Sequence, residues 1–289
     1  MMQRLNAMTV DVEDYFHVQA FAHCIARSAW EQLPRRVEHN TDLVLDQFAA
    51  AGVKATFFTL GWVAQRHPAL VRRIVREGHE LASHGWDHTQ AHRQDPETFR
   101  ADIRRTKAVL EDIAGVHVGG YRAPSFSIST RNLWAFSILA QEGYRYSSSI
   151  NPVRHDLYGM PEAPRTPFRP YADGVLEIPM TTVRLWGRNW PCSGGGYFRL
   201  LPKVLYRAGL RHVNRRERQP GVFFFHPWEI DPGQPRVPGA GWKSHLRHYT
   251  NLSSMAAGVE SLLRSFAWDR MDRVYAPLLA SAPSAALAA

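Results

Sequence analysis

AMTVDVED, residues 7–14, is a short apolar segment that ends in three acids, Asp11, Glu13 and Asp14. Its first six residues, Ala7–Val12, predict a β-strand. Similar segments occur further along the chain, with KATFFTL at residues 54–60 and VFFF at residues 222–225. Both are short and rich in aromatic or β-branched residues, so both predict further buried strands.

Helical segments separate these strands. Thr41 is expected to cap a helix that ends at Gly52, and Asp95 before Pro96 predicts the start of a helix that runs to Gly115. The remaining predicted strands lie at residues 80–83, 119–122, 146–150 and 175–179, and the remaining helices at residues 70–77, 130–142 and 203–216. Alternating strands and helices indicate an α/β protein with parallel pairing.

About seven such strands favour a closed or nearly closed barrel. An open doubly wound sheet stays an alternative, although no glycine-rich nucleotide-binding motif begins a helix. Residues 151–172 and 184–200 are rich in Pro and Gly and predict long loops. Residues 276–289 are rich in Ala, Ser and Pro and predict a flexible tail. Long loops inside a compact domain are usually functional.

The composition excludes several classes of protein. The chain has 289 residues, 45% of them hydrophobic and 21% charged, which is ordinary for a globular protein and argues against disorder. Two cysteines, Cys24 and Cys192, cannot form a disulfide framework or a four-thiolate zinc site. No nucleic-acid-binding motif is present, so no nucleic-acid partner is expected. The densest basic cluster has helical spacing and is interpreted as a solvated helix face, formed by Arg211, His212, Arg215, Arg216 and Arg218.

The first residues predict a cytoplasmic protein without a signal peptide. They lack an apolar stretch, and acids begin at Asp11. The formal net charge of +9 favours anionic partners, so peripheral contact with an anionic membrane at its inner face is a further expectation.

Residues capable of catalysis follow the predicted strands. The active site of a parallel α/β barrel lies at the carboxyl ends of its strands. The acids follow the first strand, His84 and His88 follow the third, Arg122 ends the fourth, and His226 follows VFFF. Each of these residues also has a purely structural interpretation. His84 and His88 could be surface histidines, Arg122 could form a surface ion pair, and His226 could be a buried histidine of the core.

The combination of residues is more specific than any one of them. Three acids within four residues repel one another unless a cation is near. Two neutral imidazoles and one carboxylate can bind a metal ion and leave positions open for water and substrate. A second carboxylate can then act as a base, which is the minimum for metal-assisted hydrolysis.

These segments resemble the five ordered motifs of the polysaccharide deacetylase family, also called the NodB-homology family or carbohydrate esterase family four. The similar segments are TVDVED at 9–14, SHGWDH at 83–88, YRAP at 121–124, VLEIP at 175–179 and FHP at 225–227. The resemblance implies a distorted (β/α)7 barrel over residues 5–230. It also implies a divalent metal, Zn²⁺ by expectation, and N-acetylated polysaccharide or lipid-linked glycan as substrate.

Three further segments resemble the subgroup of this family that is associated with exosortase (PEP-CTERM) exopolysaccharide loci. They are HDLYG at 155–159, SGGGYFR at 193–199 and HPWEID at 226–231. The subgroup implies a C-terminal extension, here residues 190–275, packed on the barrel. The substrate would then be an exopolysaccharide or its precursor.

The resemblance assigns roles to six residues. Arg122 orients the base, His226 is the catalytic histidine, and His84 and His88 bind the metal. The first motif departs from the family pattern, because its acids are not an adjacent pair of aspartates. We assign Asp11 as base and Asp14 as metal ligand. Glu13 is the alternative for either role.

Two rival functions stay open. The same fold could hydrolyse a cyclic amide, as allantoinase-like relatives do, and the altered first motif leaves room for this. A non-catalytic carbohydrate-binding protein is the second rival, and it predicts neither a bound metal nor an effect of Asp11→Asn.

Overall fold

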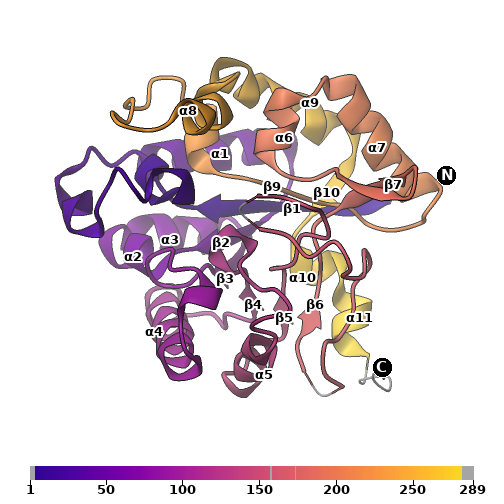
Figure 1. Ribbon diagram of the computed structural model, residues 1–289, viewed down its shortest axis with the longest axis horizontal. Helices are drawn as coiled ribbons and strands as arrows, with labels where there is room; N and C mark the ends of the chain where they lie inside the picture. Colours follow the sequence, from indigo (N-terminus) through magenta and orange to yellow (C-terminus); the bar gives the residue numbers. More distant parts are fainter. Residues whose placement is uncertain (1–3, 157, 173, 282–289) are drawn as a thin grey trace.

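A computed structural model describes residues 4–156, 158–172 and 174–281 of the chain. Within these residues, eight parallel strands form one sheet, with β9 paired to β1 and the order β10-β1-β2-β3-β4-β5-β6 (Figure 1). The strands are β1 (Leu5–Val12), β2 (Thr56–Thr59), β3 (Glu80–Ser83), β4 (Gly120–Tyr121), β5 (Tyr146–Ser147), β6 (Leu176–Glu177), β9 (Val222–Phe225) and β10 (Ala267–Asp269). The sheet curves into a half-barrel, and the predicted α/β barrel is confirmed.

Strand β1 is the centre of the sheet. Ala7 pairs with both β10 and β9, and Thr9 pairs with both β2 and β9. Therefore β10 and β2 share one side of β1, and β9 occupies the other. No pairing joins β6 to β9 among the described residues, so the barrel stays open there.

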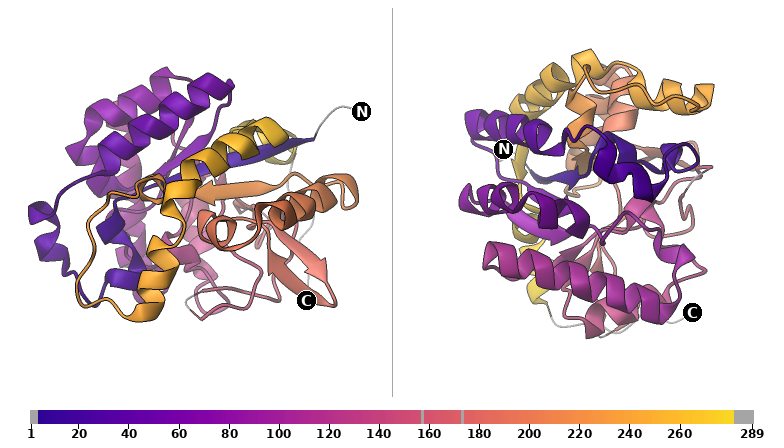
Figure 2. Two further views of the ribbon diagram at one scale, coloured as in Figure 1. Left: turned by 90° about the horizontal axis from the view of Figure 1, so that it is seen from above. Right: turned by 90° about the vertical axis from the view of Figure 1, so that its left-hand side faces the viewer.

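Helices cover the sheet in two groups (Figures 1 and 2). The first group comprises α1 (Val37–Ala51), α2 (Gly61–Arg66), α3 (Pro68–Arg76), α4 (Pro96–Ala114) and α5 (Trp134–Gln141). The second lies beside β1 and β9 and comprises α6 (Gly195–Leu200), α7 (Lys203–Arg215), α8 (Trp242–Tyr249) and α9 (Met255–Ser265). Two short helices, α10 (Met271–Val274) and α11 (Ala276–Ala280), follow β10. Among the described helices, none has the length and apolar character of a membrane span.

Local sequence signals explain several boundaries. Gly52 and Gly115 end α1 and α4 with φ values of 65° and 66°, a conformation that costs glycine little. Asp95 caps α4 by accepting hydrogen bonds from the backbone N–H groups of Glu97 and Thr98. These three signals were predicted and are confirmed.

Other predicted boundaries are wrong. Helix α1 begins at Val37, one turn before the predicted cap Thr41, whose hydroxyl donates to the carbonyl of Val37 inside the helix. Residues 184–200 are not one long loop, since an antiparallel hairpin, β7 (Thr182–Leu185) and β8 (Arg188–Pro191), precedes α6 there. The predicted tail begins too early, because Ala276–Ala280 form α11; residues 282–289 lie outside the described residues.

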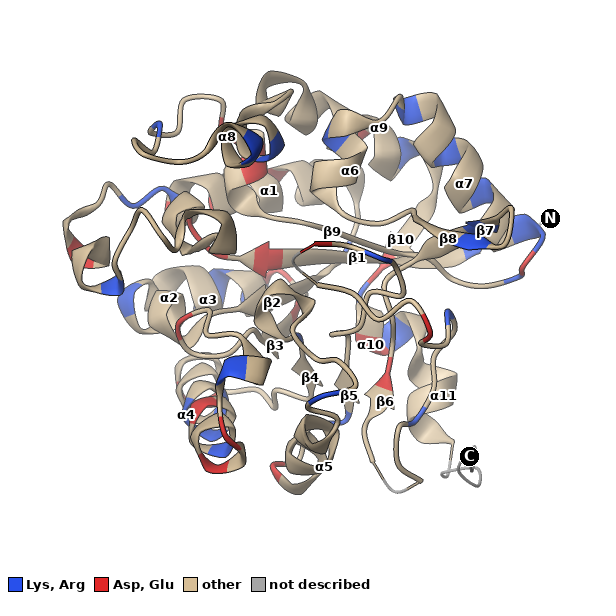
Figure 3. Ribbon diagram, viewed as in Figure 1, with Lys and Arg blue, Asp and Glu red and all other residues tan. Residues whose placement is uncertain are grey.

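The predicted C-terminal extension also contributes to the sheet itself. Strand β10 lies beyond residue 230, yet its three residues pair with the first half of β1. The basic cluster lies on and just after α7, and all five of its residues are exposed. Figure 3 marks the Lys and Arg positions along that helix in blue. Cys24 and Cys192 are both free cysteines.

Candidate active site

Five of the candidate residues meet at the carboxyl ends of β1, β3 and β9. A cavity of about 250 Å³ opens there, and its lining includes Asp11, Glu13, His84, His88 and His226. Arg122 is not part of the lining, because it lies behind Asp11 with no exposed surface. The sequence therefore brings five of its candidate residues to one cavity and places a sixth in support.

Three of these residues could hold a metal ion. One ligand atom from each of Glu13, His84 and His88 lies within 4.8 Å of the others. The carbonyl of Arg122 lies 2.8 Å from Nδ1 of His84. Because a carbonyl only accepts, Nδ1 carries the proton and Nε2 keeps its lone pair for a ligand.

The chemistry of this set fits a divalent cation. Oε2 of Glu13 is buried and accepts no hydrogen bond, although Nε2 of His88 lies only 2.9 Å away. Burial lowers the pKa of His84 to about 4, so its ring is neutral, as a ligand must be. Burial alone would raise the pKa of Glu13, but His88 and His226 beside it keep that pKa well below its usual value.

The backbone at the histidine pair is unusual. His88 has a φ of 61°, and Gly85 between the two histidines has a φ of 75°. A non-glycine residue in this left-handed region is strained, and such strain is often found at functional sites. The tight turn brings the two imidazole rings to a centroid distance of 5.4 Å.

Asp14 is not part of this group, so the predicted ligand set needs correction. Its Oδ2 accepts hydrogen bonds from the backbone N–H groups of Arg36 and Val37, and its Oδ1 accepts from Tyr15. Asp14 thus supplies the start of α1 with the acceptor that Thr41 was expected to provide. Glu13, the alternative considered from the sequence, is the acid that lies beside the histidines.

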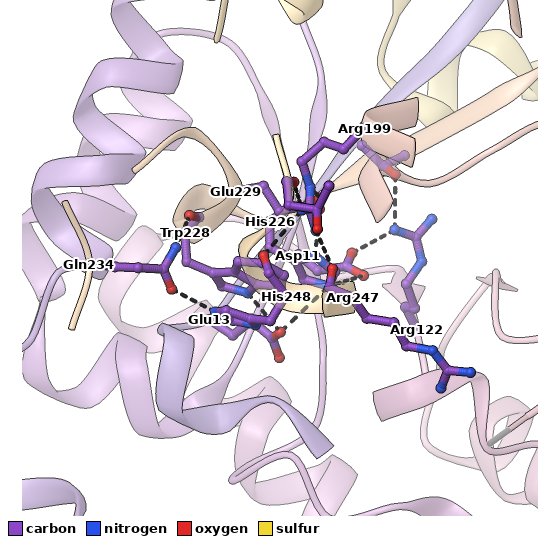
Figure 4. Close-up of polar contacts among 12 residues, drawn as sticks. Asp11, Glu13, Arg122, Arg199, His226, Trp228, Glu229, Gln234, Arg247 and His248 are labelled. Atoms are coloured by element: carbon purple, nitrogen blue, oxygen red, sulfur yellow. Dashed lines mark hydrogen bonds and ion pairs between the residues drawn. The ribbon is translucent and has the colours of Figure 1, made fainter. Parts of the chain in front are cut away.

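Asp11 is held by a buried arginine (Figure 4). Its Oδ1 accepts a 2.5 Å hydrogen bond from Nη1 of Arg122, which also donates to the hydroxyl of Thr9 at 2.9 Å. Nε of Arg122 donates to the carbonyl of Ser148, and its Nη2 donates to the hydroxyl of the same residue. The guanidinium of Arg122 lies 4.0 Å from the ring centroid of Phe58. The other carboxylate oxygen of Asp11 faces the cavity, 4.0 Å from Nε2 of His226.

His226 lies between two acids. Its Nε2 is 3.5 Å from Oε1 of Glu13, and its Nδ1 is 2.9 Å from Oε1 of Glu229. Burial alone would lower its pKa, but Glu13 and Glu229 raise the pKa of His226 to about 9. The raised pKa favours the protonated ring, which can donate a proton.

No role was predicted for Glu229 or Arg199, although they lie in HPWEID at 226–231 and SGGGYFR at 193–199. Glu229 follows His226 by three residues, and that spacing is the one signal that could have revealed it. Arg199 lies 30 positions from Glu229, and no spacing rule relates them. The ring of Trp228 stacks on His226, with centroids 5.0 Å apart, and its Nε1 donates to Glu13.

Of the tryptophans Trp86, Trp186, Trp190 and Trp228, which lie in or near loops, only Trp228 lines the cavity. Trp86 packs over Gly61 and carries the guanidinium of Arg105 on its ring. Trp186 lies on the β7–β8 hairpin with 90% of its surface exposed, and Trp190 follows on β8.

Two family models match the chain in succession. Residues 28–147 match the polysaccharide deacetylase model, and residues 148–276 match a domain of unknown function, DUF3473. His84, His88 and Arg122 fall in the first match, and His226 falls in the second.

Curated relatives share shorter segments. A peptidoglycan-N-acetylglucosamine deacetylase of Listeria monocytogenes is 38% identical over 81 residues, which are 28% of this chain and 17% of that protein. A chitooligosaccharide deacetylase of Rhizobium leguminosarum bv. trifolii is 27% identical over 150 residues, 50% of this chain and 61% of that protein. The matches therefore span less than two thirds of either relative.

Solved structures agree on the fold. A crystal structure described only by family, as a polysaccharide deacetylase from Mycobacterium smegmatis, has a TM-score of 0.62 at 21% identity and covers 99% of this chain and 95% of its own. A carbohydrate esterase family 4 pseudoenzyme from Bacillus anthracis has a TM-score of 0.50 at 13% identity, covering 94% of this chain and 65% of its own. Because this fold also occurs in a pseudoenzyme, activity has to be argued from the residues of the site.

Proposed function

We propose that this chain, which contains a polysaccharide deacetylase domain, removes N-acetyl groups from the sugars of a polysaccharide in a metal-dependent reaction. One observation carries the proposal. The carboxylates of Asp11 and Glu13 and the imidazoles of His84, His88 and His226 line the same cavity. That set contains a ligand triad, a base and an acid, which amide hydrolysis requires.

Glu13, His84 and His88 would hold the divalent ion, which we propose to be Zn²⁺. When bound there, such an ion supplies an acidified water and compensates negative charge on the acetamide oxygen. The ligand set of two imidazoles and one carboxylate leaves positions open for both.

The protein supplies the proton transfers. Asp11 accepts the proton of the attacking water through the oxygen that faces the cavity. Arg122 fixes the orientation of that carboxylate, because its guanidinium is buried against it. His226 donates a proton from Nε2 to the leaving amine, and acetate departs.

We further propose that the glycan is an exopolysaccharide or its lipid-linked precursor, modified in the cytoplasm at the inner face of the membrane. The subgroup resemblance of residues 155–159, 193–199 and 226–231 supports the first part. The net charge of +9 supports contact with an anionic membrane.

The test pairs two histidine variants. His84→Ala should lose both the bound metal, measured by elemental analysis of the purified protein, and acetate release from chitin oligomers. His92→Ala is the matched control, because His92 follows His88 at the same four-residue spacing that separates His84 from His88. His92 is exposed and lies on the neighbouring short helix at Ala91–Arg93. Unchanged acetate release by folded His84→Ala would refute the assignment.

The rival functions give different results in the same assays. Ring opening of a small ureide, without acetate release from any chitin oligomer, would favour the cyclic-amide hydrolase. A wild-type protein that binds no metal and releases no acetate would favour the non-catalytic carbohydrate-binding protein.

A further inference from the structure

A chain of buried contacts leads from His226 away from the cavity (Figure 4). Oε1 of Glu229 lies 2.9 Å from Nδ1 of His226 and also accepts from the backbone N–H of His226 at 3.1 Å. Because a carboxylate only accepts, Nδ1 is the donor. This contact leaves Nε2 directed at Asp11 and Glu13, where the proton is needed.

Glu229 is held in turn by Arg199 of α6. Its Oε2 accepts a 2.8 Å hydrogen bond from Nε of Arg199, and both side chains are at most 2% exposed. An unpaired buried carboxylate would take up a proton and lose its preference as an acceptor. Arg199 and His226 prevent this, since they outweigh burial and lower the pKa of Glu229 to about 2.

Arg199 is fixed at its other donors. Its Nη1 and Nη2 groups donate to the backbone carbonyls of His248, Thr250 and Arg247, at the end of α8. These carbonyls have no partner within the helix, and a guanidinium is well suited to them. The position of Arg199 therefore depends on α6 and α8 packing together.

The backbone of α6 also makes room for Glu229. A Cβ atom added at Gly195 would lie 2.3 Å from Oε1 and 2.5 Å from Oε2 of Glu229. Only glycine allows the helix to approach the carboxylate this closely. Two of the segments that resemble the exopolysaccharide subgroup, residues 193–199 and 226–231, thus meet at one carboxylate.

We propose that Glu229 and Arg199 are positioning residues for His226, and that α6 and α8 complete the catalytic site by holding them. The inference rests on the proposed function for its kinetic consequence. It gives a role to part of the segment that matches the domain of unknown function: that segment fixes the hydrogen bonding and orientation of the catalytic histidine.

The main test is Glu229→Gln, which preserves shape but removes the charge. We expect kcat for acetate release to fall about 100-fold, with KM and bound metal nearly unchanged, because loss of a supporting partner of this kind costs roughly 10- to 100-fold. The downfield Nδ1–H proton resonance of His226, which a carboxylate partner produces, should also be lost from the NMR spectrum. A folded Glu229→Gln protein with wild-type kcat and an unchanged Nδ1–H resonance would overturn the proposal.

A second pair of variants leaves every charge in place. Gly195→Ala should displace Glu229 and lower kcat by at least tenfold, because the added methyl group cannot fit beside the carboxylate. Gly241→Ala is the control, since a Cβ there meets nothing within 4 Å and the residue is exposed. Equal kcat in these two folded variants would overturn the role of α6.

An exposed ion pair in the same part of the chain controls for general effects of charge removal. Glu260 and Arg264 form a pair on the surface of α9, so Glu260→Gln should leave kcat and the His226 resonance unchanged. If wild-type protein releases no acetate, the proposed function fails. The NMR comparison of wild type with Glu229→Gln still decides whether Glu229 positions His226.

Discussion

Two buried acids of the same sheet have opposite surroundings. Asp11 on β1 pairs with Arg122 and faces the cavity, whereas Glu177 on β6 accepts hydrogen bonds from the backbone N–H groups of Ser149 and Ile150. Burial raises the pKa of Glu177 to about 7. Asp11 thus has a cation hydrogen-bonded to it, whereas Glu177 accepts from backbone amides and fixes the chain after β5.

The difference shows what distinguishes the proposed catalytic base, Asp11, from a structural carboxylate in this barrel. Both residues are at most 2% exposed, so burial alone does not identify the site. The partners of the two residues distinguish them. Asp11 has a cation and a cavity beside it, whereas Glu177 has backbone amides beside it.

The largest effect is expected for Asp11→Asn, and the matched change Glu177→Gln in a separate variant is its comparison. Asp11→Asn should lower kcat at least 1,000-fold with metal retained, because a general base contributes roughly 10²–10⁴-fold. Glu177→Gln should stay within about threefold of wild-type kcat, since Gln can still accept from both backbone amides. Acetate release at saturating substrate measures both, and an equal loss in the two variants would abolish the distinction.

The second prediction concerns stability against pH. Folding raises the pKa of Glu177 from 4.5 to about 7, so between these values the unfolded chain releases the proton and the folded chain keeps it. Stability contributed by the protonated group is therefore complete below about pH 4.5 and is lost as the pH rises to 7, by on the order of 3 kcal/mol. Urea unfolding at a series of pH values should show a flatter profile for Glu177→Gln than for wild type. Identical profiles would contradict the shift.

The smallest effect is expected at the third acid of the first segment. Asp14→Ala removes the acceptor for three backbone N–H groups and should lower the free energy of unfolding by about 2 kcal/mol, the upper range for a lost helix cap. Bound metal, measured by elemental analysis, should stay at the wild-type ratio. Loss of the metal from folded Asp14→Ala would restore Asp14 as a ligand and exclude the structural role.

Much of the fold could be predicted because its signals are local. VFFF forms β9 over the predicted four residues, and Gly52, Asp95 and Gly115 mark helix ends through their own backbone preferences. Strand β10 and helix α6 were not predicted. The first is three residues long and the second contains two glycines, so their formation depends on tertiary pairing and packing rather than on local preference.

The site shows the same division between local and tertiary information. His84, His88, Arg122 and His226 could be found from their positions after predicted strands. The choice between Glu13 and Asp14 could not, because adjacent residues near a strand end point in different directions. Which of them faces the histidines depends on where α1 begins, and that start was predicted one turn too late.

The order of the strands has a consequence for how the protein is made. Strand β1 emerges first from the ribosome, but two of its three neighbours, β9 and β10, come from residues 222–225 and 267–269. Until those residues are synthesised, a strand that is buried from Asn6 to Val12 in the folded protein exposes backbone groups able to pair with another chain. Nascent chains should therefore depend on chaperones that shield this edge, and premature termination before residue 267 should yield aggregates rather than a smaller enzyme.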